Sequence, residues 1–403
     1  MKQKKIIALL LIAAMATALF SGCSSKEDTV VIGYIGDLSG ADAYVGIPPQ
    51  LFLQDYFAKV NENGGLLGKK VKLVAYDMQP DNAVDGVNAC NRLISQDHAI
   101  AILGPSSSSA AIPMANICDE AKVPFIATSA TNEKVTVAED GTLHPYAFRV
   151  CFIDSYQGTA AAKYAFNDGC RKVGLIETLG NPYSQNICNY FEEAFTALGG
   201  EIADRIGIQA EDVEFRAQLT NFANMGVDTL FVPSGTYKQP AYIANQAKDL
   251  GLDFQFIFTD GVYDDTLLEV AGPAVEGCMM TNVIYGNNPE YAAFAAEHNA
   301  KHADWPANIF VYLAYDAVEL LMYGIRTSNS LDSVKIRDAI EAANDVALFT
   351  DKHFTVDNET HNPKDQMVAI IEVKDGKYNL RDTFYPSLMD YALRDRSCAD
   401  IVS

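Results

Sequence analysis

The chain is short of basic residues. It carries 30 lysines and arginines against 52 aspartates and glutamates, which gives a formal net charge of −22 at pH 7. So acidic a protein repels the phosphates of nucleic acids and the head groups of anionic lipids, because charges of the same sign repel. The composition therefore excludes nucleic acid as a partner. About half of the residues are hydrophobic, so the chain can still bury a substantial core.

The chain also lacks the short motifs that mark many enzymes and metal proteins. Its eight cysteines include no C-x-x-C pair, which argues against zinc ribbons and thioredoxin-like chemistry. No G-x-S-x-G serine elbow is present. His298 and His302 have the spacing of a zinc pair, but no glutamate follows the first histidine. We therefore expect no enzyme activity, no cofactor and no metal, and we expect the isolated cysteines to be mostly free thiols.

The N-terminal residues 1–22 have the pattern of a bacterial lipoprotein signal peptide. Three lysines precede an apolar run over residues 6–20, which is too short for a membrane span of roughly 20 residues. A serine and a glycine then lead to Cys23, as in the lipobox whose cysteine is lipidated, although Phe20 stands where a smaller aliphatic residue is usual. We expect lipidation of Cys23 and a polar tether over residues 23–29. An ordinary secretory signal with an incidental cysteine is the alternative.

Strand and helix patterns alternate along the rest of the chain. The apolar run Val30–Ile35 predicts a buried strand, residues 36–46 a glycine-containing loop, and the spacing of apolar residues over Pro49–Asn63 a helix. Further strands are expected over residues 70–77, 99–103, 124–127, 172–177, 201–207, 229–233, 255–259 and 367–374 and near 352–356, and further helices over residues 82–96, 110–121, 157–167, 183–198, 215–225, 240–250, 311–327 and 333–343.

This alternation predicts the α/β class, with parallel sheets covered by helices on both faces. The pattern restarts after about residue 150, and the length suits two lobes. We expect two doubly wound lobes joined by a hinge. The first lobe should comprise residues 30–150 and about 283–350, and the second residues 151–282 and about 351–403.

Two clusters of small hydroxyl residues follow neighbouring strands of the first lobe. Ser106–Ser109 and Thr128–Thr131 stand where a strand ends and a helix should begin. Helix N-termini offer unpaired backbone N–H groups and a partial positive charge, so two such ends facing one cleft favour binding of a carboxylate. Serines in this position are often only N-caps. A run of four beside a second cluster nevertheless favours a binding site for a small anionic or zwitterionic molecule.

The ordered set of local patterns resembles the branched-chain amino-acid-binding receptors, which have the type I periplasmic-binding fold. The resemblance covers nearly all of the chain after the signal. It rests on residues 32–40, 63–71, 75–77, 106–109, 128–131, 182–184, 214–219, 246–248 and 259–261. It implies an extracytoplasmic receptor, anchored to the membrane by lipid, that delivers a small amino acid of the branched-chain type to the permease of an ABC transporter.

The resemblance also implies roles for particular residues. It places Ser107 and Ser108 against the ligand carboxylate, and Ser129 and Thr131 at positions that hold the amino group and the carboxylate. From the second lobe, Tyr183 corresponds to an aromatic residue that closes over the ligand.

Asp260 stands where an acidic residue pairs with the ligand ammonium, and a buried acid of this kind needs such a partner. Tyr237 is a further candidate for a residue that contacts the ligand, and the resemblance leaves Thr236 as an alternative at that position. Tyr44 appears one place early for a loop tyrosine of the family.

Other functions remain open at this point. The same fold could bind an amide or an aromatic carboxylate, in which case Asp260 would hardly matter. A closed receptor could instead signal to a membrane kinase. An extracellular enzyme is improbable, because no nucleophile–base or metal constellation is visible in the sequence.

Overall fold

The computed structural model describes residues 29–79, 82–284 and 288–385. The expected signal peptide, the lipidation site Cys23 and the tether up to residue 28 lie outside these described residues. No helix within the described ranges is both long enough and apolar enough to cross a membrane. The six cysteines within these ranges are buried free thiols, as expected from their isolated positions, and Sγ of Cys90 lies 3.6 Å from Sγ of Cys118.

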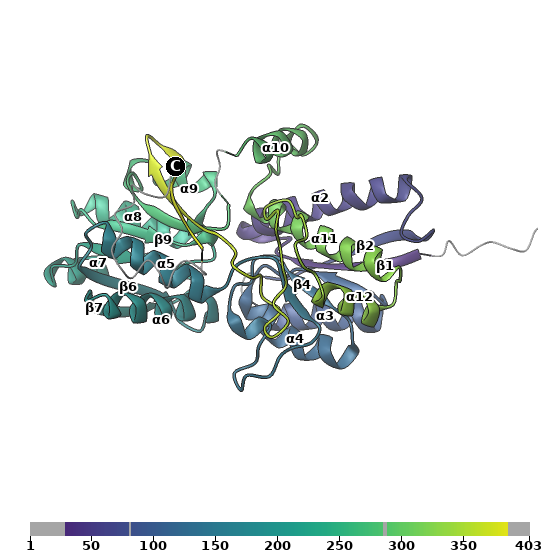
Figure 1. Cartoon of the computed structure of the whole chain (residues 1–403). Helices are drawn as coiled ribbons and strands as arrows, with labels where there is room; N and C mark the ends of the chain where they lie inside the picture. Colours follow the sequence, from purple (N-terminus) through teal and green to yellow (C-terminus); the bar gives the residue numbers. More distant parts are fainter. Residues whose placement is uncertain (1–28, 80–81, 285–287, 386–403) are drawn as a thin grey trace, which may run out of the picture.

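The first lobe is built on a five-stranded parallel sheet with the strand order β2-β1-β3-β4-β5 (Figure 1). Its strands are β1 (Thr29–Gly36), β2 (Lys70–Asp77), β3 (Ala101–Leu103), β4 (Phe125–Ala127) and β5 (Ala147–Arg149). Helices α3 (Ala83–Ser95) and α4 (Ser108–Ala121) pack on one face, while α2 (Ala43–Glu62) and α11 (Ile309–Ser328) pack on the other. The remaining helices of this lobe are α10 (Pro289–Lys301) and α12 (Ser333–Glu341). Both faces are covered, which is why the strands read as apolar runs.

The second lobe contains a seven-stranded sheet with the order β12-β11-β10-β9-β8-β6-β7. Its parallel strands are β6 (Lys172–Thr178), β7 (Glu201–Ile208), β8 (Thr229–Phe231), β9 (Gln255–Phe258) and β10 (Met279–Asn282). Helices α5 (Asp154–Asn167) and α6 (Pro182–Ala197) cover one face, and α7 (Arg216–Asn224), α8 (Lys238–Asp249) and α9 (Asp265–Ala271) cover the other. The predicted class, two doubly wound α/β lobes, is confirmed.

The last two strands depart from the parallel arrangement. β11 (Val368–Lys374) and β12 (Lys377–Phe384) form a hairpin that pairs antiparallel with β10. β12 was not predicted, because it lies at the sheet edge, is mostly polar and has no fully buried residue. The strand expected near 352–356 is absent from the described chain; the region forms turns with two isolated bridges, Val346 with Phe354 and Val356 with Pro363.

Helix α2 begins six residues earlier than expected, at Ala43 rather than Pro49, so most of the expected loop is helical. Pro48 lacks the N–H that would bond to the carbonyl of Tyr44, four residues back. Asn308 replaces that donor: its Nδ2 lies 2.8 Å from the carbonyl oxygen of Tyr44. A side chain more than 250 positions away therefore stabilises a helix that local sequence rules would end.

The chain passes between the lobes after β5, after β10 and before β11. The segment after α12 lies on the first lobe (Figure 1). Phe354 and Val356 join the core of that lobe, and the ring of His361 stacks on Phe148 at 4.3 Å. We propose lobe boundaries near residues 150 and 283, as the sequence indicated, and a third near 367 rather than 351. Three short crossings of this kind suit a hinge.

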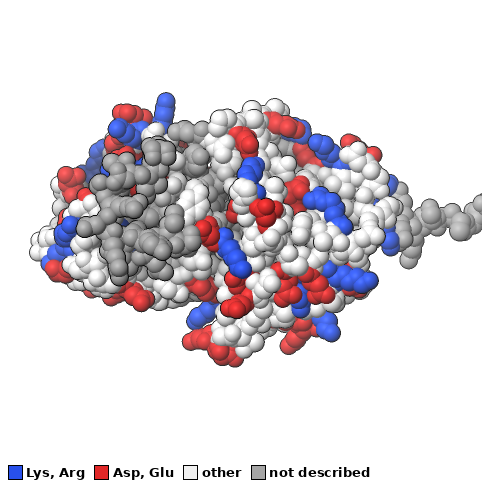
Figure 2. All heavy atoms as spheres, viewed as in Figure 1, with Lys and Arg blue, Asp and Glu red and all other residues white. Residues whose placement is uncertain are grey.

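The charges on the molecular surface are mixed. On the face shown in Figure 2, lysine and arginine side chains are interspersed with aspartate and glutamate and do not gather into a basic patch.

Candidate functional site

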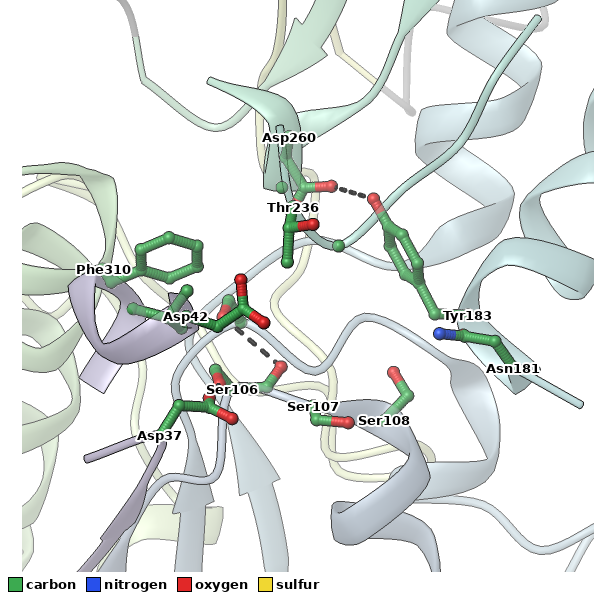
Figure 3. Close-up of a pocket in the computed structure, with 14 residues that line it drawn as sticks. Asp37, Asp42, Ser106, Ser107, Ser108, Asn181, Tyr183, Thr236, Asp260 and Phe310 are labelled. Carbon is green, nitrogen blue, oxygen red and sulfur yellow. Dashed lines mark hydrogen bonds between the residues drawn. The ribbon is translucent and has the colours of Figure 1, made fainter. Parts of the chain in front are cut away.

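The lobes enclose a pocket at the carboxyl ends of their parallel strands. In each sheet the strand order reverses beside the first strand, between β1 and β3 and between β6 and β8. The loops at such switch points diverge and leave a crevice in which α/β proteins commonly bind ligands. The pocket is lined by Asp37, Asp42, Val45, Ser106, Ser107, Ser108, Ser129, Asn181, Tyr183, Gly235, Thr236, Asp260, Gly261 and Phe310 (Figure 3).

The first lobe contributes a wall of hydroxyl groups. Ser107 is the N-cap of α4 and Ser108 is its first residue, so both lie at the positive end of a 14-residue helix. The hydroxyl of Ser129, which follows β4, donates to the carbonyl of Ser106 at 3.4 Å. Such a wall suits a carboxylate, because hydroxyls and helix N-termini both offer hydrogen-bond donors.

A glycine at the end of β3 makes this arrangement possible. Gly104 has φ +87°, and a Cβ there would lie 2.3 Å from the carbonyl oxygen of Ile35 in β1. Any other residue would push β1 and β3 apart at the switch point. The serine run that follows Gly104 therefore depends on this close approach for its position.

The second lobe contributes a buried carboxylate. Asp260 follows β9 and is 5% exposed; its Oδ1 accepts hydrogen bonds from the hydroxyl of Tyr183 at 2.5 Å and from Nε2 of Gln157 at 2.9 Å. Burial raises the pKa of Asp260 above its usual value, and the two donors partly offset that rise. A carboxylate with these donors is held in one orientation, as Figure 3 shows for its contact with Tyr183.

The lobes touch each other on both sides of the pocket. On one side, Nζ of Lys238 lies 2.5 Å from Oδ1 of Asp42, and the rings of Tyr44 and Tyr237 are 5.2 Å apart. On the other side, Nδ2 of Asn132 donates to the carbonyl of Pro182 at 2.9 Å. The structure therefore represents lobes that have closed around the pocket.

Comparison with known proteins identifies the fold. A family model described as periplasmic binding protein matches residues 29–377. This chain belongs to the periplasmic binding protein family. The match confirms the resemblance seen in the sequence, and the receptors in this family are solute-binding proteins rather than enzymes.

Individual relatives of this periplasmic binding protein are similar along most of the chain. It is 27% identical over 333 residues to a leucine-, isoleucine-, valine-, threonine- and alanine-binding protein of Pseudomonas aeruginosa, covering 82% of this chain and 87% of that one. The crystal structure of the leucine-binding protein LivK of Thermotoga maritima superposes with a TM-score of 0.79 at 28% identity, covering 89% and 99% of the two chains. LivJ of Streptococcus pneumoniae in complex with isoleucine gives a TM-score of 0.79 at 25% identity, covering 89% and 100%.

The structure of this periplasmic binding protein brings most of the expected site residues together. Ser107, Ser108, Ser129, Tyr183 and Asp260 all line the pocket.

Two expected residues are not among the lining residues. Thr131 is fully buried, and its carbonyl accepts from the backbone N–H of Asp154 at 3.1 Å, at the first crossing between the lobes. Tyr237 packs against Tyr44 instead of lining the pocket. Its neighbour Thr236, which the resemblance left as the alternative, does line the pocket.

Several lining residues were not expected from the sequence. Asp37 directly follows β1 at the switch point, so the rule that drew attention to the serines could also have found it. Asn181 is the N-cap of α6 and could have been found beside Tyr183. Phe310 had no local signal, because it reaches the pocket from α11, more than 200 residues after β1.

Proposed function

We propose that this protein is an extracytoplasmic receptor that captures an α-amino acid for import by an ABC transporter. The observation that carries the proposal is that donors suited to a carboxylate and a buried carboxylate suited to an ammonium reach the same pocket from different lobes. Hydroxyls and the N-terminus of α4 lie on the first lobe, while the buried carboxylate of Asp260 lies on the second. An α-carboxylate and an α-ammonium would satisfy both ends and draw the lobes together.

The roles follow from the geometry. Ser107 and Ser108 would bind the α-carboxylate, and the hydroxyl of Ser129 would contact the ligand between its α-carboxylate and its α-ammonium. Asp260 would pair with the α-ammonium while Tyr183 and Gln157 hold its side chain in place. Relatives named for binding leucine, isoleucine, valine, threonine and alanine support an amino acid as the ligand, because these share only the α-carboxylate and α-ammonium.

We further propose that Cys23 is lipidated and holds the receptor at the outer face of the membrane, where a permease could accept its ligand. The family membership supports an extracytoplasmic location. Mass spectrometry of the mature N-terminus tests the anchor: a diacylated cysteine is expected. Release of Cys23→Ser into the soluble fraction would agree with it, and an unmodified Cys23 would contradict it.

Ligand binding is tested by thermal shift and titration calorimetry on the mature protein, with the amino acids, short amides and benzoate as ligands. A ligand that binds only the folded state stabilises it by about 2.7 kcal/mol at a concentration of 100 times Kd. We expect stabilisation by one or more amino acids. Stabilisation by benzoate or amides alone would contradict the role of Asp260, and a sensor function would show as binding without transport in a strain with the permease intact.

A further inference from the structure

The side of the pocket that faces away from Asn181 and Tyr183 is acidic. Figure 3 shows Asp37 and Asp42 there, beside Phe310. Asp37 follows β1 and Asp42 closes the short 3-10 turn before α2, and the two residues are 4% and 9% exposed. Oδ2 of Asp37 accepts from the hydroxyl of Ser106 at 3.2 Å. This side is where the side chain of a bound amino acid would lie.

The charge balance of the pocket is one-sided. The fourteen described residues that line it include three aspartates and no lysine, arginine or histidine. Lys238 approaches from α8 and contacts Asp42 at 2.5 Å, but it is not part of the lining. Because Lys238 pairs with Asp42, the carboxylates at the pocket outnumber the ammonium groups by three to one, and a neutral zwitterion would leave that balance unchanged.

Few apolar side chains line the pocket. Val45 and Phe310 are the only aliphatic or phenyl side chains among the lining residues. A branched aliphatic side chain would remove water from this side of the pocket and add neither a donor nor a positive charge to those that Ser106 and Lys238 already supply to Asp37 and Asp42. The two carboxylates therefore favour a ligand side chain that carries a hydrogen-bond donor or a positive charge over one that is purely aliphatic.

We infer that the ligand is an amino acid with a cationic side chain, whose terminal ammonium or guanidinium group binds between Asp37 and Asp42. The inference rests on the proposed amino-acid function, because it uses Asp260 and the serines for the α-groups. Val45 and Phe310 would contact the methylene stem, and the phenyl face would favour a nearby cation. A ligand with a net charge of +1 would also reduce the repulsion among the three aspartates.

Arginine and citrulline provide the sharpest test, because they are nearly isosteric and differ in charge. Calorimetric titration of the mature protein should give a Kd for arginine lower than that for citrulline by on the order of tenfold or more. Norleucine and leucine should bind more weakly than citrulline. In Asp37→Asn the arginine-to-citrulline preference should fall severalfold. Asp304→Asn, which removes one exposed surface charge, should leave that preference intact.

Different outcomes bear on the cationic side chain, on the role of Asp37 and on the amino-acid function. Equal affinity for arginine and citrulline, or tighter binding of leucine, isoleucine or valine, would overturn the cationic side chain while keeping the amino-acid receptor. An unchanged preference in Asp37→Asn would overturn the role of that residue. Binding of no amino acid at all would overturn the proposed function itself.

Discussion

Replacing Asp260 with asparagine should weaken ligand binding without weakening the unliganded fold. Asparagine has nearly the same shape and can still accept from Tyr183 and Gln157, so the main loss is the charge opposite the ligand ammonium. Removing one partner of a buried charge pair costs about 2–5 kcal/mol. Because the two hydrogen bonds can persist, we expect the lower part of that range, about 2–3.5 kcal/mol. At about 1.4 kcal/mol per tenfold change, the affinity should fall by about 30- to 300-fold.

The unliganded variant should respond in the opposite direction. Burial raises the pKa of Asp260, which means that the ionised carboxylate is less favourable in the empty pocket than in water. Asparagine removes this penalty, so the melting temperature without ligand should equal or exceed that of the wild type. Calorimetry gives the affinity and differential scanning gives the melting temperature, with Asp304→Asn as the control for net charge. An affinity within threefold of the wild type, or a markedly lower melting temperature of the ligand-free variant, would refute the reasoning.

Three further predictions concern hydrogen bonding, backbone packing and titration. Donation from Tyr183 lowers the pKa of Asp260, so Tyr183→Phe should raise that pKa, and as the pH is lowered the ligand affinity should begin to fall at a higher pH than in the wild type. Coincident curves of affinity against pH for the two proteins would contradict this. A Cβ on Gly261 would lie 2.6 Å from the carbonyl oxygen of Ser234, so Gly261→Ala should displace the loop that carries Thr236. We expect the free energy of ligand binding to weaken by about 1–3 kcal/mol. An unchanged Kd would contradict this, because it would show that the loop accommodates the methyl group. Burial raises the pKa of Asp316 to about 7, so between about pH 4 and pH 7 this carboxyl keeps a proton in the folded protein that it releases in the unfolded chain. The contribution of Asp316 to stability is therefore full below about pH 4 and is lost as the pH rises to about 7. The difference in unfolding free energy between wild type and Asp316→Asn, from urea titrations, should therefore fall over that window, and a flat difference would contradict it.

The alternation of strands and helices was predictable because both lobes repeat one local rule. Buried parallel strands read as apolar runs, and capped helices follow them; Asn82, for example, accepts from the backbone N–H of Val84 at 3.0 Å at the start of α3. The rule fails where distant residues decide the outcome. α2 extends through Pro48 because Asn308 supplies a donor, and the segment around Phe354 joins the first lobe through tertiary packing.

The same distinction divides the pocket into a predictable and an unpredictable part. Ser107, Ser129 and Asp260 each lie within four residues of the carboxyl end of a parallel strand, so topology brings them to one crevice. These are the residues proposed to hold the α-groups that all amino acids share. Phe310 and Asp42 reach the other side of the pocket from α11 and from a turn before α2, and no repeating pattern places them. A fold of this kind can therefore keep its amino-acid poles while its side-chain specificity changes through residues outside the strand ends. Under the inferred preference for a cationic side chain, that separation lets a chain that superposes on leucine- and isoleucine-binding relatives keep their fold and bind a different amino acid.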